Sequence, residues 1–197
     1  MAVNERTAYH HGDLRNALVA AGVELARQGG PQAVVLREAA RATGVSPTAA
    51  YRHFADREAL VAAVAGRALG LMARRMQEEA GRTPRRRTRA DRALERFRAV
   101  GRAYALFAEE EPGLFRTAFG GPSTGIDQDP YDQLVAALDE LVAAGALPAA
   151  RRDGAEVPAW AAVHGAAVLL EGPLAGLPAA ERRACLERVL DTVVDGI

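Results

Sequence analysis

The chain of 197 residues contains no lysine, because all 25 of its basic residues are arginine. It therefore lacks the side chain that forms Schiff bases, anchors pyridoxal phosphate or completes a phosphate-binding P-loop. Its single cysteine, Cys185, excludes a disulfide within the chain, and we expect it to be a small buried residue on the last helix. No group of Cys and His residues has metal-ligand spacing, so the sequence predicts no metal and no cofactor.

Aromatic residues and long apolar runs are also scarce. Aromatics make up 5% of the chain, and no apolar run reaches the length of about 18 residues that a membrane-spanning helix requires. The N-terminus has no apolar stretch resembling a signal peptide. We therefore expect a cytoplasmic protein with no membrane partner. Hydrophobic residues still make up 49% of the chain, enough to build a core.

The formal net charge is zero, but the charges are unevenly distributed. Residues 1–102 carry 19 arginines against 10 acidic residues, whereas residues 103–197 carry 6 arginines against 15 acidic residues. A basic first half suits a polyanionic partner. The run Arg82–Arg92 is most simply interpreted as a solvated loop between helices, and the sequence does not say whether it contacts anything.

Apolar residues recur every three to four positions along most of the chain, and no segment alternates as a strand does. The pattern predicts an all-α protein with about nine helices, preceded by a disordered arm at residues 1–8. Asp13 and Asp56 are suited to cap helices. The expected helices cover about 13–28, 36–43, 47–54, 56–80, 91–109, 114–119, 131–145, 157–170 and 179–194.

The segment Leu36–Leu60 has the signals of two short helices joined by a tight turn. Gly44 can adopt the left-handed conformation that ends the first helix, Ser46 can cap the second, and Pro47 suits its first position. A helix over 47–54 has the size to enter a DNA major groove, and it presents hydroxyl, guanidinium, imidazole and phenol groups. The simpler alternative is an ordinary helical hairpin in an all-α core.

This segment resembles the helix-turn-helix of the TetR/AcrR family of bacterial transcriptional regulators. The shared residues are Arg37-Glu38, Ala40, Gly44-Val45-Ser46, Tyr51, His53-Phe54 and Arg57 to Leu60. Residues 9–14 and the later Trp160, His164 and Gly165 resemble the subgroup named for a C-terminal Trp-His-Gly motif. The resemblance implies a three-helix DNA-binding domain at residues 1–55 and a C-terminal regulatory, ligand-binding and dimerisation domain at residues 56–197.

The resemblance also implies residues that contact double-stranded DNA. Arg37 and Arg52 are the expected readers of base edges, and Tyr51 and His53 resemble phosphate contacts. Val35 departs from the family, which commonly has Ser or Thr there as a helix cap. The full expected set is Arg37, Pro47, Thr48, Ala49, Tyr51, Arg52, His53 and Arg57.

Two further sets follow from the resemblance, one for self-association and one for an effector. The expected homodimer interface consists of Ala161, Gly165, Val168, Leu186, Val189, Leu190 and Val193. The expected pocket for an unidentified small-molecule effector is lined by Met72, Phe97, Val100, Tyr104, Phe107, Phe115, Phe119, Leu138, Trp160 and His164. These large apolar side chains can equally be ordinary core.

The sequence thus predicts a homodimeric repressor that a small lipophilic effector releases from a palindromic operator. An activator of the same fold, or a regulator without an effector, remains an alternative. A more remote alternative is an enzyme with His164 as a base near Glu171, but no nucleophile accompanies them. The loop Gly120–Asp129 contains two glycines with phosphate-loop spacing, yet Ile126 follows where lysine is needed.

Overall fold

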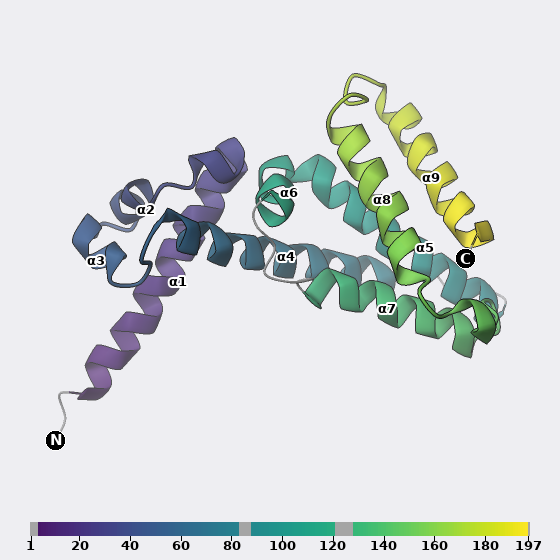
Figure 1. Cartoon of the computed structure of the whole chain (residues 1–197), viewed down its shortest axis with the longest axis horizontal. Helices are drawn as coiled ribbons and strands as arrows, with labels where there is room; N and C mark the ends of the chain where they lie inside the picture. Colours follow the sequence, from purple (N-terminus) through teal and green to yellow (C-terminus); the bar gives the residue numbers. More distant parts are fainter. Residues whose placement is uncertain (1–3, 83–87, 121–127, 197) are drawn as a thin grey trace. The chain divides into compact units, whose positions relative to one another are not determined.

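The computed structural model describes the backbone of residues 4–82, 88–120 and 128–196, and the side chains of residues 14–82, 88–120 and 130–196. Within these ranges the chain forms nine α-helices and two short 3-10 helices, and no strand (Figure 1). The predicted all-α class is therefore confirmed. No helix among the described residues is long and apolar enough to cross a membrane. Residues 83–87 of the Arg82–Arg92 run and residues 121–127 of the loop 120–129 lie outside the described residues.

The chain divides into two compact units, and each is built from two separate segments. The first unit comprises residues 1–69 and 111–123, and the second comprises residues 70–110 and 124–197. Compact units and functional domains are different divisions of a chain. The predicted domain boundary at residues 55 and 56 therefore stays a prediction.

The first unit contains six helical elements around a small core. Leu18, Leu60 and Val64 are fully buried there, and Phe54 is 2% exposed. Both α1 and α3 pack against α2, and α6 packs against α1 and η1. The elements are α1 (Asn4–Gly29), η1 (Gly30–Ala33), α2 (Leu36–Ala42), α3 (Pro47–Tyr51), the first part of α4 (Arg57–Gly81), and α6 (Pro112–Phe119).

Helix α6 packs closely against the C-terminal end of α1. A Cβ added to Gly113 would lie 2.1 Å from the carbonyl oxygen of Ala26, so only glycine fits at this crossing. Next to it, the Nε of Arg27 donates hydrogen bonds to both carboxylate oxygens of Glu111, at 3.1 and 3.0 Å. Although α6 is distant in sequence, it is thus an integral part of the first unit.

The second unit is a bundle in which α5 packs against three other helices, α7, α8 and α9. Its core residues include Phe97, Val100 and Phe107 of α5, with Leu138 and Leu141 of α7, all at most 5% exposed. The remaining elements are α5 (Arg89–Glu110), α7 (Gln128–Ala143), η2 (Ala149–Arg151), α8 (Glu156–Glu171) and α9 (Ala179–Gly196), together with the last part of α4.

Ion pairs and a close contact hold α9 along α5. A Cβ added to Gly101 would lie 2.5 Å from the Cδ2 of Leu190, so this glycine accommodates the leucine side chain. Three ion pairs join the two helices: Arg98 with Asp191, Arg102 with Glu187, and Glu109 with Arg182.

The first helix is longer than predicted. Its backbone is helical from Asn4, so the prediction of a disordered arm over residues 1–8 is wrong from residue 4 onward. Residues 4–12, which precede the predicted helix start, contain no proline. Their single glycine, Gly12, lowers the stability of a helix by only about 1 kcal/mol, which is too little to end it. The side chains of the Tyr9–Asp13 motif lie outside the described residues.

Candidate nucleic-acid interface

The turn between α2 and α3 has the local geometry that its sequence predicts. Gly44 adopts φ +71°, a left-handed conformation that glycine takes without strain. The Oγ of Ser46 accepts a hydrogen bond from the amide of Ala49 at 3.2 Å, and Pro47 follows it as the first helical residue. The predicted cap and turn are confirmed, and together they fix the angle at which α3 leaves α2.

The start of α2 lacks a side-chain cap. Val35 occupies the capping position with φ −120° and ψ 127°, makes no cap hydrogen bond and is 38% exposed. Those backbone angles are the extended ones that serine and threonine adopt when they cap a helix. The departure from the family pattern is thus one of side chain only.

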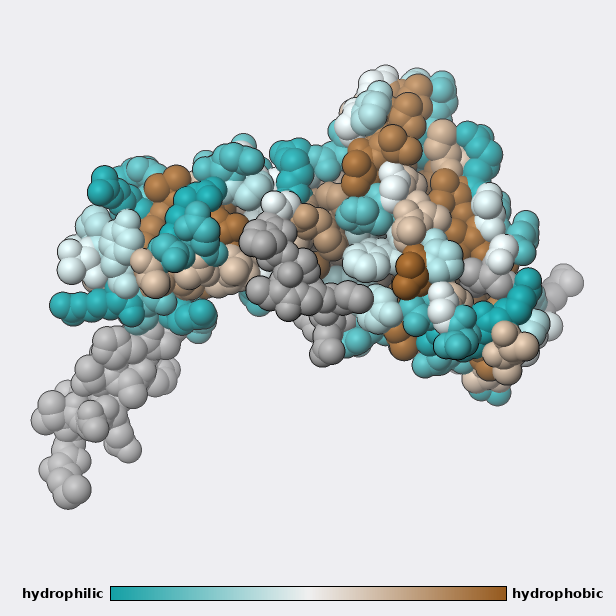
Figure 2. Space-filling view, viewed as in Figure 1, coloured by the Kyte–Doolittle hydropathy of each residue, from teal (hydrophilic) through white to brown (hydrophobic). Residues whose placement is uncertain are grey.

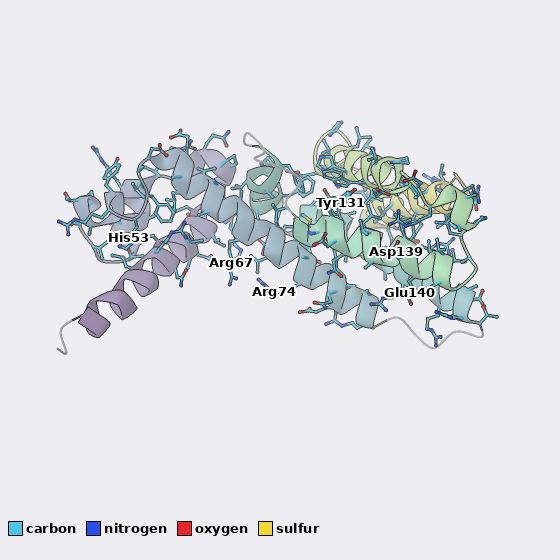
Figure 3. The ribbon with its side chains drawn as sticks, turned by 60° about the horizontal axis from the view of Figure 1, so that its bottom comes forward. His53, Arg67, Arg74, Tyr131, Asp139 and Glu140 are labelled. Atoms are coloured by element: carbon cyan, nitrogen blue, oxygen red, sulfur yellow. The ribbon has the colours of Figure 1, made fainter. Side chains whose placement is uncertain are left out.

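Helix α3 is shorter than predicted. It ends at Tyr51 rather than Phe54, and its last turn tightens. The amide of His53 bonds to the carbonyl of Ala50 at 2.9 Å, and the amide of Phe54 bonds to the same carbonyl at 3.1 Å. His53 therefore lies in the turn that follows α3 (Figure 3).

The outer side of α2 and α3 is polar and exposed, while the inner side is apolar and buried. Ala50 and Phe54 are buried, as the helical spacing predicts. Tyr51 is 48% exposed although it is a large aromatic residue. The predicted DNA contacts that are exposed are Arg37, Pro47, Thr48, Tyr51 and Arg52, and those that are half-buried are Ala49, His53 and Arg57.

The arginines of this region differ in whether a carboxylate already neutralises them. Arg41 pairs with Glu38 on the surface of α2, with Nη2 and Oε2 2.7 Å apart. Arg37 and Arg52 have no ion pair with any carboxylate among the described side chains. Their donors are therefore available to an external acceptor, and arginine is the side chain best suited to the O6 and N7 atoms of guanine.

Arg57, at the start of α4, is partly engaged within the first unit. Its Nη2 donates a hydrogen bond to the carbonyl oxygen of Pro31, and its Nη1 lies 3.7 Å from Glu58. The Arg57 side chain is 40% exposed, so its other N–H donors remain accessible to solvent. The sequence indicated a DNA contact here but gave no sign of the contact with η1, which joins residues 26 positions apart.

A polar cluster lies inside the second unit, where Tyr104 of α5 meets Trp160 and His164 of α8. The Oη of Tyr104 lies 2.7 Å from the Nδ1 of His164 and accepts a 3.3 Å hydrogen bond from the Nε1 of Trp160. Burial lowers the pKa of His164, and burial raises the pKa of Tyr104 well above its usual value. Both groups are therefore favoured in their neutral forms at pH 7.

The predicted effector-pocket residues are divided between the two units. Phe115 and Phe119, whose ring centroids are 5.0 Å apart, belong to the first unit. The other eight belong to the second unit, where Met72 and Leu138 are fully buried. The structure brings together Tyr104, Trp160 and His164 from this set. Their contact with an effector stays a prediction.

A groove of about 950 Å³ opens along α8 and α9. Figure 2 shows hydrophobic residues gathered over these two helices, and Val168 and Leu169 of α8 are 45% and 50% exposed. Small residues of α8 line the groove together with apolar residues of α9. The lining includes the predicted Ala161, Gly165, Val189 and Val193, and also Arg151, Asp153, Ala162, Leu169, Cys185, Arg188 and Thr192.

Leu186 and Leu190 are predicted interface residues, and that role stays a prediction, whereas Cys185 departs from its expected burial. Leu186 and Leu190 are 6% and 1% exposed and belong to the core of the second unit. Cys185 is half-buried rather than buried, lines the groove and accepts a hydrogen bond from the Nη2 of Arg188 at 3.1 Å. The helical period alone does not distinguish the side of α9 that faces α5 from the side that faces the groove.

Comparisons with known proteins identify the family. The family model for bacterial regulatory proteins of the tetR family matches residues 18–64, and the model for the tetracyclin repressor-like C-terminal domain matches residues 97–193. The first match contains all of α2 and α3, and the second extends from Phe97 in α5 to Val193 in α9. No curated protein matches the chain.

Solved structures share the fold over nearly the whole chain. A protein of unknown function from Rhodococcus sp. RHA1 is 28% identical, with a TM-score of 0.75 over 96% of this chain and 97% of that one. The transcriptional regulator FadR from Bacillus subtilis, solved in complex with stearoyl-CoA, is 16% identical, with a TM-score of 0.68 over 92% and 98%. A tetR-family transcriptional regulator from Streptomyces coelicolor is 22% identical, with a TM-score of 0.64 over 92% and 79%.

The two family matches, the capped helix-turn-helix and the shared fold lead to one conclusion. The chain belongs to the TetR family of bacterial regulatory proteins, and it is a DNA-binding transcriptional regulator.

Proposed function

We propose that the protein is a homodimeric repressor that a small lipophilic effector releases from a palindromic operator. The observation that carries the dimer is the open groove of about 950 Å³ along α8 and α9. Exposed apolar side chains beside a surface of small residues allow another helix pair to approach closely. Association of two copies would cover Val168 and Leu169, which are otherwise half-exposed.

The dimensions of α3 support the same conclusion from the DNA side. A helix of five residues can present only a few side chains to base edges. Two copies related by a two-fold axis read two half-sites and so double the sequence that is recognised. Within each copy, we assign base contacts to Arg37 and Arg52, further edge contacts to Thr48 and Ala49, and phosphate contacts to Tyr51 and His53.

The effector part of the proposal rests on the polar cluster inside the second unit. Tyr104, Trp160 and His164 offer a few polar atoms among apolar side chains, which is the composition of sites for lipophilic molecules. The structure of Bacillus subtilis FadR was solved with stearoyl-CoA, and this supports a ligand of that class. We also assign the chain to the Trp-His-Gly subgroup, and we expect it in the cytoplasm, where the chromosome is.

The dimer is tested by measuring the molar mass of the purified protein by light scattering during size-exclusion chromatography. A Gly165→Leu substitution places a large side chain in the groove, at a position where a Cβ meets no atom of the same chain within 4 Å. We expect a dimer for the natural protein and a monomer for this variant. A monomeric natural protein at micromolar concentration would contradict the proposal.

The operator and effector are tested together. Selection of bound fragments from random DNA should yield a palindrome, and thermal-shift screening of acyl-CoA esters and other lipophilic compounds should yield a stabilising ligand. Release of the repressor requires that such a ligand also weakens operator binding, because the ligand must favour the form of the protein that does not bind DNA. A stabilising ligand that strengthens operator binding would instead indicate a ligand-activated regulator. A complete lack of ligands would favour regulation without an effector.

A further inference from the structure

Arg15 of α1 contacts the ring of Phe54, which lies in the turn that follows α3. Its guanidinium carbon is 4.8 Å from the centre of the Phe54 ring, a distance that is typical of a cation–π contact. Phe54 is 2% exposed, so the ring is held firmly by the core, whereas Arg15 is exposed. The guanidinium is therefore placed against a well-buried ring whose residue directly follows Arg52 and His53 in the chain.

The charge of Arg15 is not neutralised by any carboxylate among the described side chains. Arg27, on the same helix, shows the contrast, since it pairs with both Glu24 and Glu111. A guanidinium that stacks on a ring keeps its N–H donors in its own plane, where they can still bind an acceptor. Arg15 thus combines a fixed position with unused donors.

We propose that Arg15 contacts the DNA phosphate backbone and that the Phe54 ring holds it in position for this contact. A phosphate oxygen accepts strong charge-assisted hydrogen bonds from a guanidinium. Stacking limits the conformations that the long side chain explores, so less conformational entropy is lost when phosphate binds. Phosphate contacts position a protein on DNA without reading its sequence. Arg15 therefore helps to position α3 on the DNA, whereas Arg37 and Arg52 discriminate between bases.

The test is the salt dependence of binding to a fluorescent duplex of random sequence, measured by anisotropy. In Arg15→Met the charge is removed, but an apolar side chain still covers the Phe54 ring. We expect the slope of log K against log salt to fall by about 0.9 for each bound copy, the value for one phosphate contact. Arg27→Met removes the same charge from the same helix and should leave the slope unchanged.

Arg15→Lys separates charge from stacking. Lysine keeps the charge but not the planar group, so its slope should equal that of the natural protein while its affinity falls several-fold. Circular dichroism defines a temperature at which every variant is folded, and all slopes are compared there. An unchanged slope for Arg15→Met, or an equal fall for Arg27→Met, would overturn the proposal. Because Lys retains the charge, a lowered slope for Arg15→Lys would also contradict it.

Discussion

Arg102 of α5 forms a two-pronged ion pair with Glu187 of α9, with Nε 2.5 Å from Oε1 and Nη2 2.8 Å from Oε2. Its Nη1 also donates to Glu95 at 2.8 Å. The hydrogen bonds to Glu187 are the main reason why the pKa of Arg102 lies above its ordinary value. This arginine therefore connects α9 to the centre of the second unit through a charged group that is only about one-third exposed.

Glu187→Gln should weaken the attachment of α9 to α5. The amide keeps the size of the side chain but loses the charge, so we expect a loss of about 1–2 kcal/mol, between the values for surface and buried pairs. The free energy of unfolding in urea measures it. Arg183→Gln, also on α9 but without an ion pair among the described side chains, is the control and should change stability little. Equal losses of stability in both variants would show that a change in the net charge of α9, and not the Arg102–Glu187 contact, is responsible.

Val35→Thr should stabilise the protein. Val35 already has the extended backbone of a capping residue, so the new hydroxyl can accept a hydrogen bond from a free amide in the first turn of α2. We expect a gain of about 1 kcal/mol in the free energy of unfolding, measured in urea. Val157→Thr, at a more exposed valine inside the first turn of α8, is the control and should give no gain. A neutral Val35→Thr would mean that the hydroxyl does not reach the helix.

Arg52→Ala and Arg37→Ala should each reduce sequence discrimination. Each removes a guanidinium without an ion pair from the outer side of the helix-turn-helix, at an expected cost of about 1–3 kcal/mol for the selected operator relative to random DNA. The ratio of the two dissociation constants measures it. Arg41→Ala removes a charge that Glu38 already neutralises, and the ratio should stay close to that of the natural protein. If Arg52→Ala leaves this ratio intact, the contact assignment is wrong.

The stability that depends on His164 should decrease as the pH falls. Burial lowers the pKa of His164 in the folded protein, so the unfolded chain binds the proton first. This stability is complete above the unfolded pKa of about 6.5 and is lost below it, by at most about 1.4 kcal/mol per pH unit. We expect the natural protein to lose more stability than His164→Gln between about pH 8 and about pH 5.

Tyr104→Phe provides the matched comparison for this pH effect. Burial lowers the pKa of His164, and a phenylalanine at position 104 keeps the imidazole covered. Tyr104→Phe should therefore keep the pH dependence of the natural protein, even though it loses the 2.7 Å contact with Nδ1. Chemical denaturation at a series of pH values measures all three proteins. A pH dependence that disappears in Tyr104→Phe would assign the effect to the hydroxyl and not to burial.

Gly113→Ala should destabilise the first unit strongly. The added methyl group would lie 2.1 Å from the backbone oxygen of Ala26, and backbone cannot move aside without displacing α1 or α6. We expect a loss of about 3 kcal/mol or more in thermal or chemical unfolding. Gly66→Ala is the control, because a Cβ there meets nothing within 4 Å and alanine favours the helix by about 0.5–1 kcal/mol. A tolerated Gly113→Ala would mean that α6 does not pack as described.

The helix-turn-helix could be predicted because its signals are local. Gly44, Ser46 and Pro47 each specify the backbone at their own position, and the structure shows the conformation that each one favours. The end of α3 was predicted less well, since the turn at His53 and Phe54 depends on how two amides share the carbonyl of Ala50. No single residue in that turn carries a helix-stop signal.

Contacts between distant parts of the chain could not be predicted from the sequence patterns. Tyr104 and His164 both belong to the predicted pocket lining, but their contact spans 60 positions and depends on how α5 crosses α8. The stacking of Arg15 on Phe54 likewise needs the packing of α1 against the helix-turn-helix. Packing also determines which side of α9 faces α5, because Leu190 fills the space beside Gly101 of α5.

The discontinuous first unit has a consequence for the synthesis of the protein. Because α6 contributes residues 112–119 to this unit, the first unit is incomplete when residue 69 leaves the ribosome. The Gly113 crossing and the Arg27–Glu111 pair form only after some fifty further residues have been translated. Before that point the nascent chain carries its helix-turn-helix without the packing of α6 against α1, so we expect the first unit to reach its full stability only after residues 112–119 have been translated.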